Sequence, residues 1–156
     1  MTRIFLHGLE SSNQGTKAVF FRDMYPDMII PTFTGDLQER MSRLNEILSG
    51  ASDIRMVGSS FGGLMGTVFT MENESAVKRL VLLAPAIHVL DAAPESIHPI
   101  SLPVTVYHGS KDEVIPIDKV RRVAETYFLD LDFHTVVDDH MLHETFKAID
   151  WEALLD

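Results

Sequence analysis

The stretch that decides the fold is DIRMVGSSFGGLMGTV, residues 53–68. Its first five residues predict a short buried strand, and the apolar side chains after position 60 recur at the spacing of a helix. Between the two lies Ser60, flanked by Gly58 and Gly62 in a G-x-S-x-G pattern. A strand-to-helix turn this tight strains its central residue and brings neighbouring chain so close that only glycine fits on either side. We therefore expect Ser60 at the apex of the turn, with its hydroxyl projecting outward.

The composition predicts a single globular domain spanning residues 1–156. The chain is 46% hydrophobic and 23% charged, which is typical of one domain with its own core. It contains no cysteine, so a thiol nucleophile, a disulfide and a thiolate metal site are excluded. Any nucleophile must therefore be an oxygen atom.

The charge balance argues against nucleic acid and anionic membrane surfaces as partners. The formal net charge is −10, and the one basic cluster, residues 119–122, is read as the exposed face of a helix. The first residues lead directly into a predicted strand without the features of a signal peptide, and no apolar run approaches the length of a membrane span. We expect a cytoplasmic protein that inserts into no membrane, and no oligomeric state is predicted.

Short apolar runs alternate with amphipathic stretches along the chain, which predicts βα units. Because the runs are apolar almost throughout, they indicate a mainly parallel sheet covered on both faces, that is, a three-layer αβα sandwich. Helices are predicted after Asp36, a plausible N-cap, after Pro116, and over 142–153. Six strands are expected, at Arg3–Leu6, Met28–Phe33, Ile54–Val57, Arg79–Leu83, Val104–Tyr107 and Leu131–Val137.

Polar residues follow several of these runs directly. Ligands bind at the carboxyl ends of parallel strands, so these residues should meet at one edge of the sheet. They are His7-Gly8-Leu9-Glu10 after the first run, Ser60 after the third, His108 to Asp112 after the fifth, and Asp138-Asp139-His140 after the sixth. A serine hydroxyl becomes a nucleophile when an imidazole takes its proton and a carboxylate orients that imidazole. The sequence supplies these groups in the order Ser, Asp, His.

That order resembles the α/β-hydrolase superfamily, and most closely its small lidless serine esterases and thioesterases, which include depalmitoylating and acyl-glucuronide-cleaving enzymes. Four motifs carry the resemblance and cover almost the whole chain: Phe5-Leu6-His7-Gly8, Gly58 to Gly63, His108-Gly109-x-x-Asp112-x-x-Ile115-Pro116, and Asp138-Asp139-His140. We expect the two opening antiparallel strands of larger members to be missing, because the sequence leads directly into what resembles their third strand. The segment 91–99 stands where those members insert a lid domain, so we expect a shallow, open site.

The resemblance implies that Ser60 is the nucleophile, Asp112 the acid and His140 the general base. It also implies an oxyanion hole made by the backbone N–H groups of Leu9 and Phe61, and the start of a helix at Phe61 agrees with that role.

Alternatives remain for each of the three side chains. Ser59 is a second serine at the turn, Asp91 is an alternative acid, and His143 is an alternative base. His140 and His143 together form an H-x-x-H pattern that is a weak metal-site signal, because no third ligand is evident. We expect no metal and no cofactor.

The predicted activity is hydrolysis of small carboxylic esters or thioesters through an acyl-enzyme on Ser60. His7 and His108 are interpreted as structural hydrogen-bonding groups that line the site, and Ile87, Leu90 and Met141 as possible apolar wall residues. No cationic pocket is evident, so small apolar acyl groups are favoured. Peptidase and transacylase chemistry, or a catalytically silent binding module on the same fold, are the alternatives.

Overall fold

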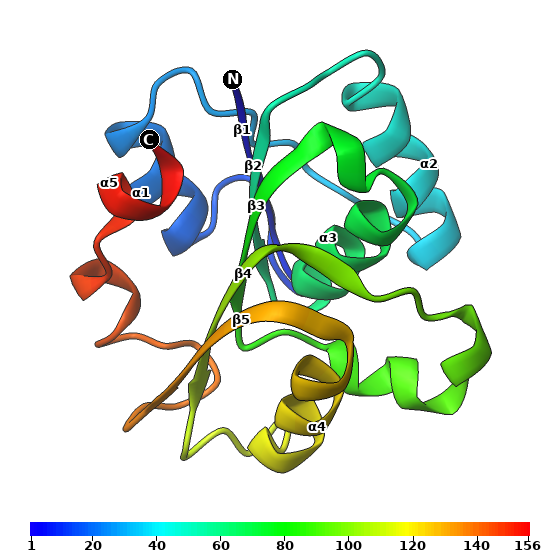
Figure 1. Ribbon diagram of the computed structural model, residues 1–156. Helices are drawn as coiled ribbons and strands as arrows, with labels where there is room; N and C mark the ends of the chain where they lie inside the picture. The colour runs from blue at the N-terminus through cyan, green and yellow to red at the C-terminus, as the bar shows by residue number, and fades with distance from the viewer.

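The fold is built on one parallel sheet. The computed structural model describes residues 1–156 apart from the side chain of Ser96. The described residues form a five-stranded sheet in which every strand pairs in parallel with the next one along the chain, as Figure 1 shows. The strands are β1 (Thr2–Leu6), β2 (Ile54–Ser59), β3 (Val77–Leu83), β4 (Ile100–Gly109) and β5 (Phe128–Val136).

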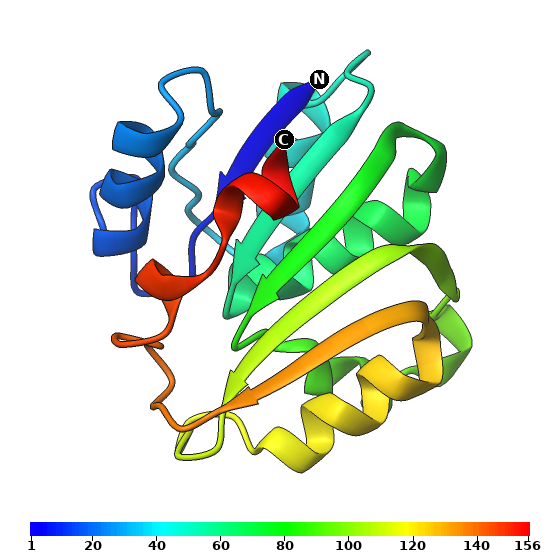
Figure 2. The ribbon, with the colours of Figure 1, turned by 60° about the vertical axis from the view of Figure 1, so that its left-hand side comes forward.

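Helices cover both faces of this sheet and give the predicted three layers. Those on one face are α2 (Leu37–Ile47), α3 (Phe61–Glu72) and α4 (Ile117–Tyr127), and those on the other are α1 (Thr16–Met24) and α5 (Trp151–Leu155) (Figures 1 and 2). Each face has its own apolar cluster. Leu44, Met65 and Val120 are buried in the first cluster, and Phe21 and Trp151 in the second.

The direction of the crossovers explains which helix covers which face. Right-handed connections that step along a sheet in one direction place their helices on the same face. The connections that lead to β2, β3 and β5 step along the sheet in the same direction, and the helices in these connections, α2, α3 and α4, lie on the same face. The chain after β1 steps the other way, because α1 leads to Ile29, which bridges Ile4 in parallel on the free side of β1. The connections from β1 and β2 therefore leave toward opposite faces, which opens a crevice at their carboxyl ends.

The predicted strand at Met28–Phe33 is reduced to that single bridge. Ile29 exchanges two hydrogen bonds with β1, from Ile29 N to Arg3 O at 2.9 Å and from Phe5 N to Ile29 O at 3.0 Å. Pro31 follows two residues later and has no N–H to donate, so the ladder does not continue. The sheet consequently has five strands rather than about six, and the other five predicted strands are confirmed within a few residues.

Two predicted helices are confirmed together with their starts. Asp36 is the N-cap of α2, where it accepts a hydrogen bond from Glu39 N at 2.9 Å, and the Glu39 carboxylate accepts one from Asp36 N at 3.0 Å. This reciprocal capping box satisfies two N–H groups that the helix itself leaves free. Helix α4 begins directly after Pro116, as expected.

The continuous helix predicted over 142–153 does not form. The structure has instead a short 3₁₀ turn, η4 (Phe146–Ala148), followed by α5. Two side chains explain the break. The buried carboxylate of Asp138 binds the N–H groups of Glu144 and Thr145, which holds that segment in a loop, and Asp150 caps a new helix by accepting from Ala153 N at 3.1 Å.

The described residues form no lid domain over the carboxyl ends of the strands. Between β3 and β4 the chain makes the 3₁₀ turns η2 (Ile87–Ala92) and η3 (Pro94–Ser96), which cover most of the short segment 91–99 that the sequence predicts in place of a lid. A third 3₁₀ turn, η1 (Glu74–Ala76), precedes β3. Among the described residues there is no helix with the length and apolarity that crossing a bilayer requires.

Candidate active site

Ser60 stands at the turn between β2 and α3. Its backbone has φ 53° and ψ −116°, a conformation that costs a non-glycine residue about 1–3 kcal/mol. The positions on either side of this turn require glycine because a side chain there would collide with neighbouring backbone. A Cβ on Gly62 would collide with the Leu6 carbonyl at the end of β1, and one on Gly58 would lie within 3 Å of the backbone of Gly62 and Gly63. The turn is thus pressed against β1, as the G-x-S-x-G pattern predicts.

Three side chains from separate loops form a hydrogen-bonded chain at the carboxyl edge of the sheet. His140 Nε2 lies 3.1 Å from Ser60 Oγ, and His140 Nδ1 lies 2.8 Å from Asp112 Oδ2. A carboxylate only accepts, so His140 carries its proton on Nδ1 and its Nε2 is free to accept the Ser60 hydroxyl proton. The Asp112 side chain is completely buried and that of His140 is 17% exposed. Ser60, Asp112 and His140, which the sequence singles out, are therefore in contact.

The Asp112 carboxylate is held by further donors. Its Oδ1 accepts from Val114 N at 2.9 Å and from Ile115 N at 2.8 Å, while its Oδ2 also lies 3.1 Å from His108 Nε2. A buried carboxylate with this many donors keeps a fixed orientation. Asp112 can therefore hold the imidazole of His140 in one orientation.

His108 is a second imidazole on the same carboxylate oxygen. It is fully buried, and its Nε2 lies between Asp112 Oδ2 and the Ile115 carbonyl oxygen at 2.9 Å, so Nε2 carries the proton. Burial lowers the pKa of His108 below its ordinary value, which keeps the ring neutral. The sequence predicts His108 in the wall of the site. It lies instead behind Asp112, outside the pocket lining.

The loop that carries His140 is anchored by Asp138. The Asp138 Oδ2 atom accepts from Glu144 N at 3.1 Å, Thr145 N at 2.9 Å and Thr145 Oγ1 at 2.8 Å, and Oδ1 accepts from Asp139 N at 2.8 Å. Burial alone would raise the pKa of this carboxyl, but these hydrogen bonds outweigh it, and the pKa lies below its ordinary value. The charged carboxylate thus ties both ends of the loop together.

The alternative residues lie elsewhere. Asp91 pairs with Arg122 at the surface, and His143, whose side chain is 64% exposed, lies 3.1 Å from Asp139 Oδ2. Ser59 lines the pocket, but among the described contacts His140 bonds to Ser60. Geometry therefore favours Ser60 over Ser59, Asp112 over Asp91 and His140 over His143.

The backbone N–H groups of Leu9 and Phe61 are free to bind a ligand. Neither donates a hydrogen bond to another described residue. Phe61 is the first residue of α3, where the helix dipole is positive, and Gly8, next to Leu9, lies against Ser60. One group thus follows Ser60 directly in the chain, and the other follows a glycine that packs against Ser60.

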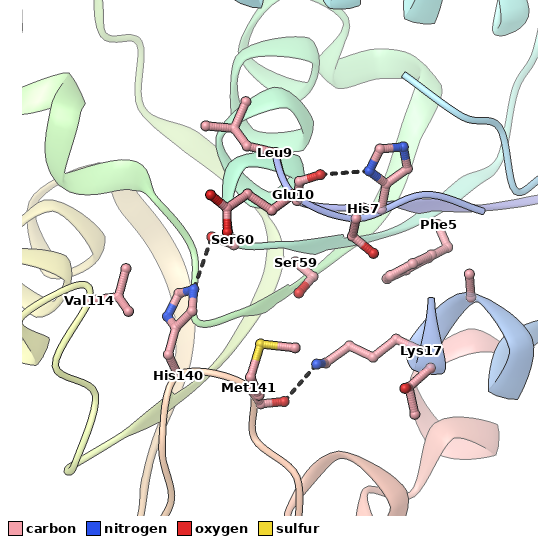
Figure 3. A pocket seen from close by; sticks show the side chains of 14 residues that line it. Phe5, His7, Leu9, Glu10, Lys17, Ser59, Ser60, Val114, His140 and Met141 are labelled. Carbon is pink, nitrogen blue, oxygen red and sulfur yellow. Dashed lines mark hydrogen bonds between the residues drawn. The ribbon is translucent and has the colours of Figure 1, made fainter. Parts of the chain in front are cut away.

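A pocket of about 600 Å³ opens at Ser60 and His140 (Figure 3). It occupies the crevice between the loop after β1, the start of α1 and the end of β2. His7 and Met141 line it, as expected from the sequence, but Ile87 and Leu90 do not. Ile87 is fully buried in the core and Leu90 packs against that core, because η2 folds back onto α3 and α4.

His7 bridges the end of β1 to the neighbouring segment. Its Nε2 accepts from Phe33 N at 2.9 Å and its Nδ1 donates to Gly8 O at 2.6 Å. Burial lowers the pKa of His7, so the ring is neutral with the proton on Nδ1. His7 therefore holds the β1 loop, including Leu9, in place beside Ser60.

Lys17 brings a positive charge into the pocket, which the sequence did not reveal. It lies in the first turn of α1, lines the pocket, and donates from Nζ to Met141 O at 2.6 Å (Figure 3). Glu10 also lines the pocket, from the loop after β1. The site is thus less uniformly apolar than the sequence predicts. Among the described residues, no three His, Asp or Glu side chains are grouped so that they could hold a metal ion.

Comparisons with known proteins bear on the fold. No protein-family model and no curated protein sequence matches this chain. Solved structures do match. They include α/β hydrolase domain-containing protein 10 from mouse, with TM-score 0.78, 18% identity, and 94% of this chain and 84% of that one covered.

Two further solved structures are also similar to this chain. Est1E from Butyrivibrio proteoclasticus, solved with ferulic acid bound, has TM-score 0.80 and 15% identity, with 98% of this chain and 86% of that one covered. An esterase from Exiguobacterium antarcticum has TM-score 0.79 and 15% identity, with coverage of 99% and 90%. At these identities the likeness establishes the fold: the chain has the α/β-hydrolase fold, as its motifs predict.

Proposed function

We propose that this chain is a serine hydrolase that cleaves small carboxylic esters or thioesters through an acyl-enzyme on Ser60. The observation that carries the proposal is the contact of Ser60 Oγ with His140 Nε2 at 3.1 Å, continued from His140 Nδ1 to the buried Asp112 at 2.8 Å. The α/β-hydrolase fold of several hydrolases and esterases supports it. A serine hydroxyl in this arrangement is activated at neutral pH.

The first half-reaction follows from the position of each group. His140 Nε2 takes the Ser60 proton as Oγ attacks the carbonyl carbon, and the carbonyl oxygen becomes an oxyanion that the N–H groups of Leu9 and Phe61 stabilise. When the tetrahedral intermediate collapses, the bond to the leaving oxygen or sulfur breaks. His140 gives its proton to that atom, and the alcohol or thiol departs while the acyl group stays on Ser60.

The second half-reaction regenerates the enzyme. Water loses a proton to His140 Nε2 and adds to the acyl carbon, forming the oxyanion again in the same place. Collapse breaks the bond to Ser60 Oγ, which recovers the proton from His140, and the carboxylic acid is released. Asp112 remains ionised throughout and stabilises the imidazolium of His140 while it exists.

The test is labelling with a fluorophosphonate probe, which reacts with activated serines. We expect the wild type to be labelled, and labelling to disappear in Ser60→Ala and in His140→Ala. The matched controls Ser59→Ala and His143→Ala should keep it, because neither side chain takes part in the hydrogen-bonded chain.

A second comparison tests the acid. Asp112→Asn should slow labelling and hydrolysis of p-nitrophenyl esters by several orders of magnitude, since loss of the carboxylate leaves His140 in the wrong tautomer. Asp91→Asn, at the surface, should behave as the wild type. A folded wild-type protein that is neither labelled nor active on an ester and thioester panel would contradict the proposal and favour a binding module.

A further inference from the structure

The pocket contains one positively charged side chain, that of Lys17, among its described lining residues. Its Nζ donates to Met141 O at 2.6 Å and lies 5.1 Å from the centre of the Phe146 ring. No second acceptor contacts this ammonium among the described residues. An ammonium has three N–H donors, so two of them have no acceptor among the described residues.

Partial burial of Lys17 favours an ion pair with an anion, while the carboxylates of Asp139 and Asp138 near it repel one. Burial lowers the pKa of Lys17 below its ordinary value, a shift that the nearby carboxylates of Asp139 and Asp138 oppose. Partial loss of hydration strengthens an ion pair made there, because less solvent has to be displaced and screening is weaker. The adjoining start of α1 has no capping side chain and no acidic residue in its first turn, so it does not neutralise the charge.

The rest of the pocket wall is mainly apolar. Phe5 and Ala18 form its buried part, while Val114 and Met141 are exposed at its mouth. Glu10 and Lys17 enter from different sides, Glu10 from the loop after β1 and Lys17 from α1, as Figure 3 shows. An apolar cavity with a few fixed polar groups orients its ligand through those groups. A ligand with one charge is therefore held in one orientation relative to Ser60.

Resting on the proposed hydrolase function, we propose that the pocket selects an ester or thioester that carries a carboxylate, which pairs with Lys17 Nζ while the scissile carbonyl lies at Ser60. The positions of Lys17 and Ser60 in the wall of one cavity carry this inference. The net charge of −10 does not attract an anion from a distance, so the preference arises within the pocket and appears as a lower KM.

Lys17 also braces Met141, the residue after His140, and the experiment separates the two roles. A brace alone affects kcat for every substrate equally, because it acts through His140. Carboxylate binding affects the KM of charged substrates and leaves neutral ones unchanged. The readout is therefore the ratio of kcat/KM between a charged substrate and an uncharged one of the same length.

The substrates are the p-nitrophenyl monoester of adipate, which has a free carboxylate, and the same compound with that carboxylate capped as a methyl ester. We expect the wild type to prefer the free carboxylate. Lys17→Met should lower that preference about tenfold through KM, the loss of one hydrogen bond to a charged group, and Lys17→Arg should keep it. Glu10→Gln is the matched control on the opposite side and should not reduce the preference.

A second pair of substrates carries the charge on the leaving group. One is a butyrate ester of a nitrophenol that has a carboxylate on its ring, and the other is the same ester with that carboxylate capped as a methyl ester. A preference in either pair that depends on Lys17 supports the inference and identifies which half of the substrate carries the charge. Equal ratios in wild type and Lys17→Met for both pairs overturn it, as does an equal fall in Glu10→Gln. If the wild type hydrolyses the capped esters as well as those with a free carboxylate, this inference alone fails. If the wild type hydrolyses none of the four esters and Ser60 is not labelled by the fluorophosphonate probe, the proposed function fails.

Discussion

Replacement of Asp138 by Asn tests whether one buried carboxylate holds the loop that carries His140. The carboxylate accepts four hydrogen bonds, three of them on Oδ2. The asparagine amide best keeps its oxygen at the Oδ2 position, which turns its NH₂ group toward the N–H of Asp139. One charge-assisted hydrogen bond, worth about 1.5–3 kcal/mol, is then replaced by two facing donors, and the remaining three lose the charge.

The expected loss of unfolding free energy is about 3 kcal/mol, which for a chain of this length lowers Tm by roughly 6–12 °C. Thr145→Val removes one donor, the hydroxyl at 2.8 Å, and should cost about 1–2 kcal/mol. Asp130→Asn is the matched control, because it makes the same change of charge at an exposed position on β5. Thermal unfolding, followed by the fluorescence of the buried Trp151, measures all three.

The contribution of Asp138 to the free energy of unfolding should depend on pH. The folded-state pKa of Asp138 lies below its ordinary value, so its contribution is fully present above the unfolded pKa of about 4. It is lost as the pH falls through the lower folded-state pKa. The gap in stability between wild type and Asp138→Asn should thus be constant near neutrality and narrow in acid. A variant as stable as Asp130→Asn, or a gap that persists unchanged well below pH 4, would refute the reasoning.

Two other substitutions have clear expected outcomes. His108→Phe removes the imidazole donor behind Asp112 and should lower kcat about tenfold or more with KM unchanged, measured with p-nitrophenyl esters, because His108 lies outside the pocket. An equal rise in KM would show that the ring shapes the pocket instead. Gly62→Ala places a methyl group against the Leu6 carbonyl and should destabilise the protein by several kcal/mol, while Gly66→Ala on the same helix meets the flexible side chain of Met56 and should cost far less, as urea unfolding would show. Equal midpoints for the two glycine variants would contradict the close approach of α3 to β1.

Much of the fold was predictable because the signals are local. The turn around Ser60 is specified by Gly58 and Gly62, whose absent side chains leave room for backbone, and the start of α2 by the pairing of Asp36 with Glu39. The order of polar residues at strand ends also indicated that Ser60, Asp112 and His140 would be near one another. The three side chains are in contact in the structure, and the catalytic roles that we propose for them rest on that contact.

The remaining differences arise from interactions between distant residues. The spacing of apolar residues predicts a helix over 142–153. It does not indicate that the Asp138 carboxylate accepts hydrogen bonds from the N–H groups of Glu144 and Thr145, which holds this segment in a loop. The run at Met28–Phe33 has the composition of a strand. It pairs with β1 only at Ile29, because Pro31 has no N–H to continue the ladder. Lys17 is unremarkable in the sequence, and only the packing of α1 beside the His140 loop puts it in the pocket.

The sequential order of the sheet has a consequence for how this protein acquires its site. Each strand pairs with the one before it in the chain, so the sheet can grow outward from β1 by adding one neighbour at a time. Ser60 follows the second strand, Asp112 the fourth and His140 the fifth, so the three residues of the proposed triad come from both halves of the sheet. A molecule in which β5 has not paired with β4 would therefore lack the contact of His140 with Ser60 and Asp112. We therefore expect hydrolysis to require the complete five-stranded sheet, down to its edge strand β5.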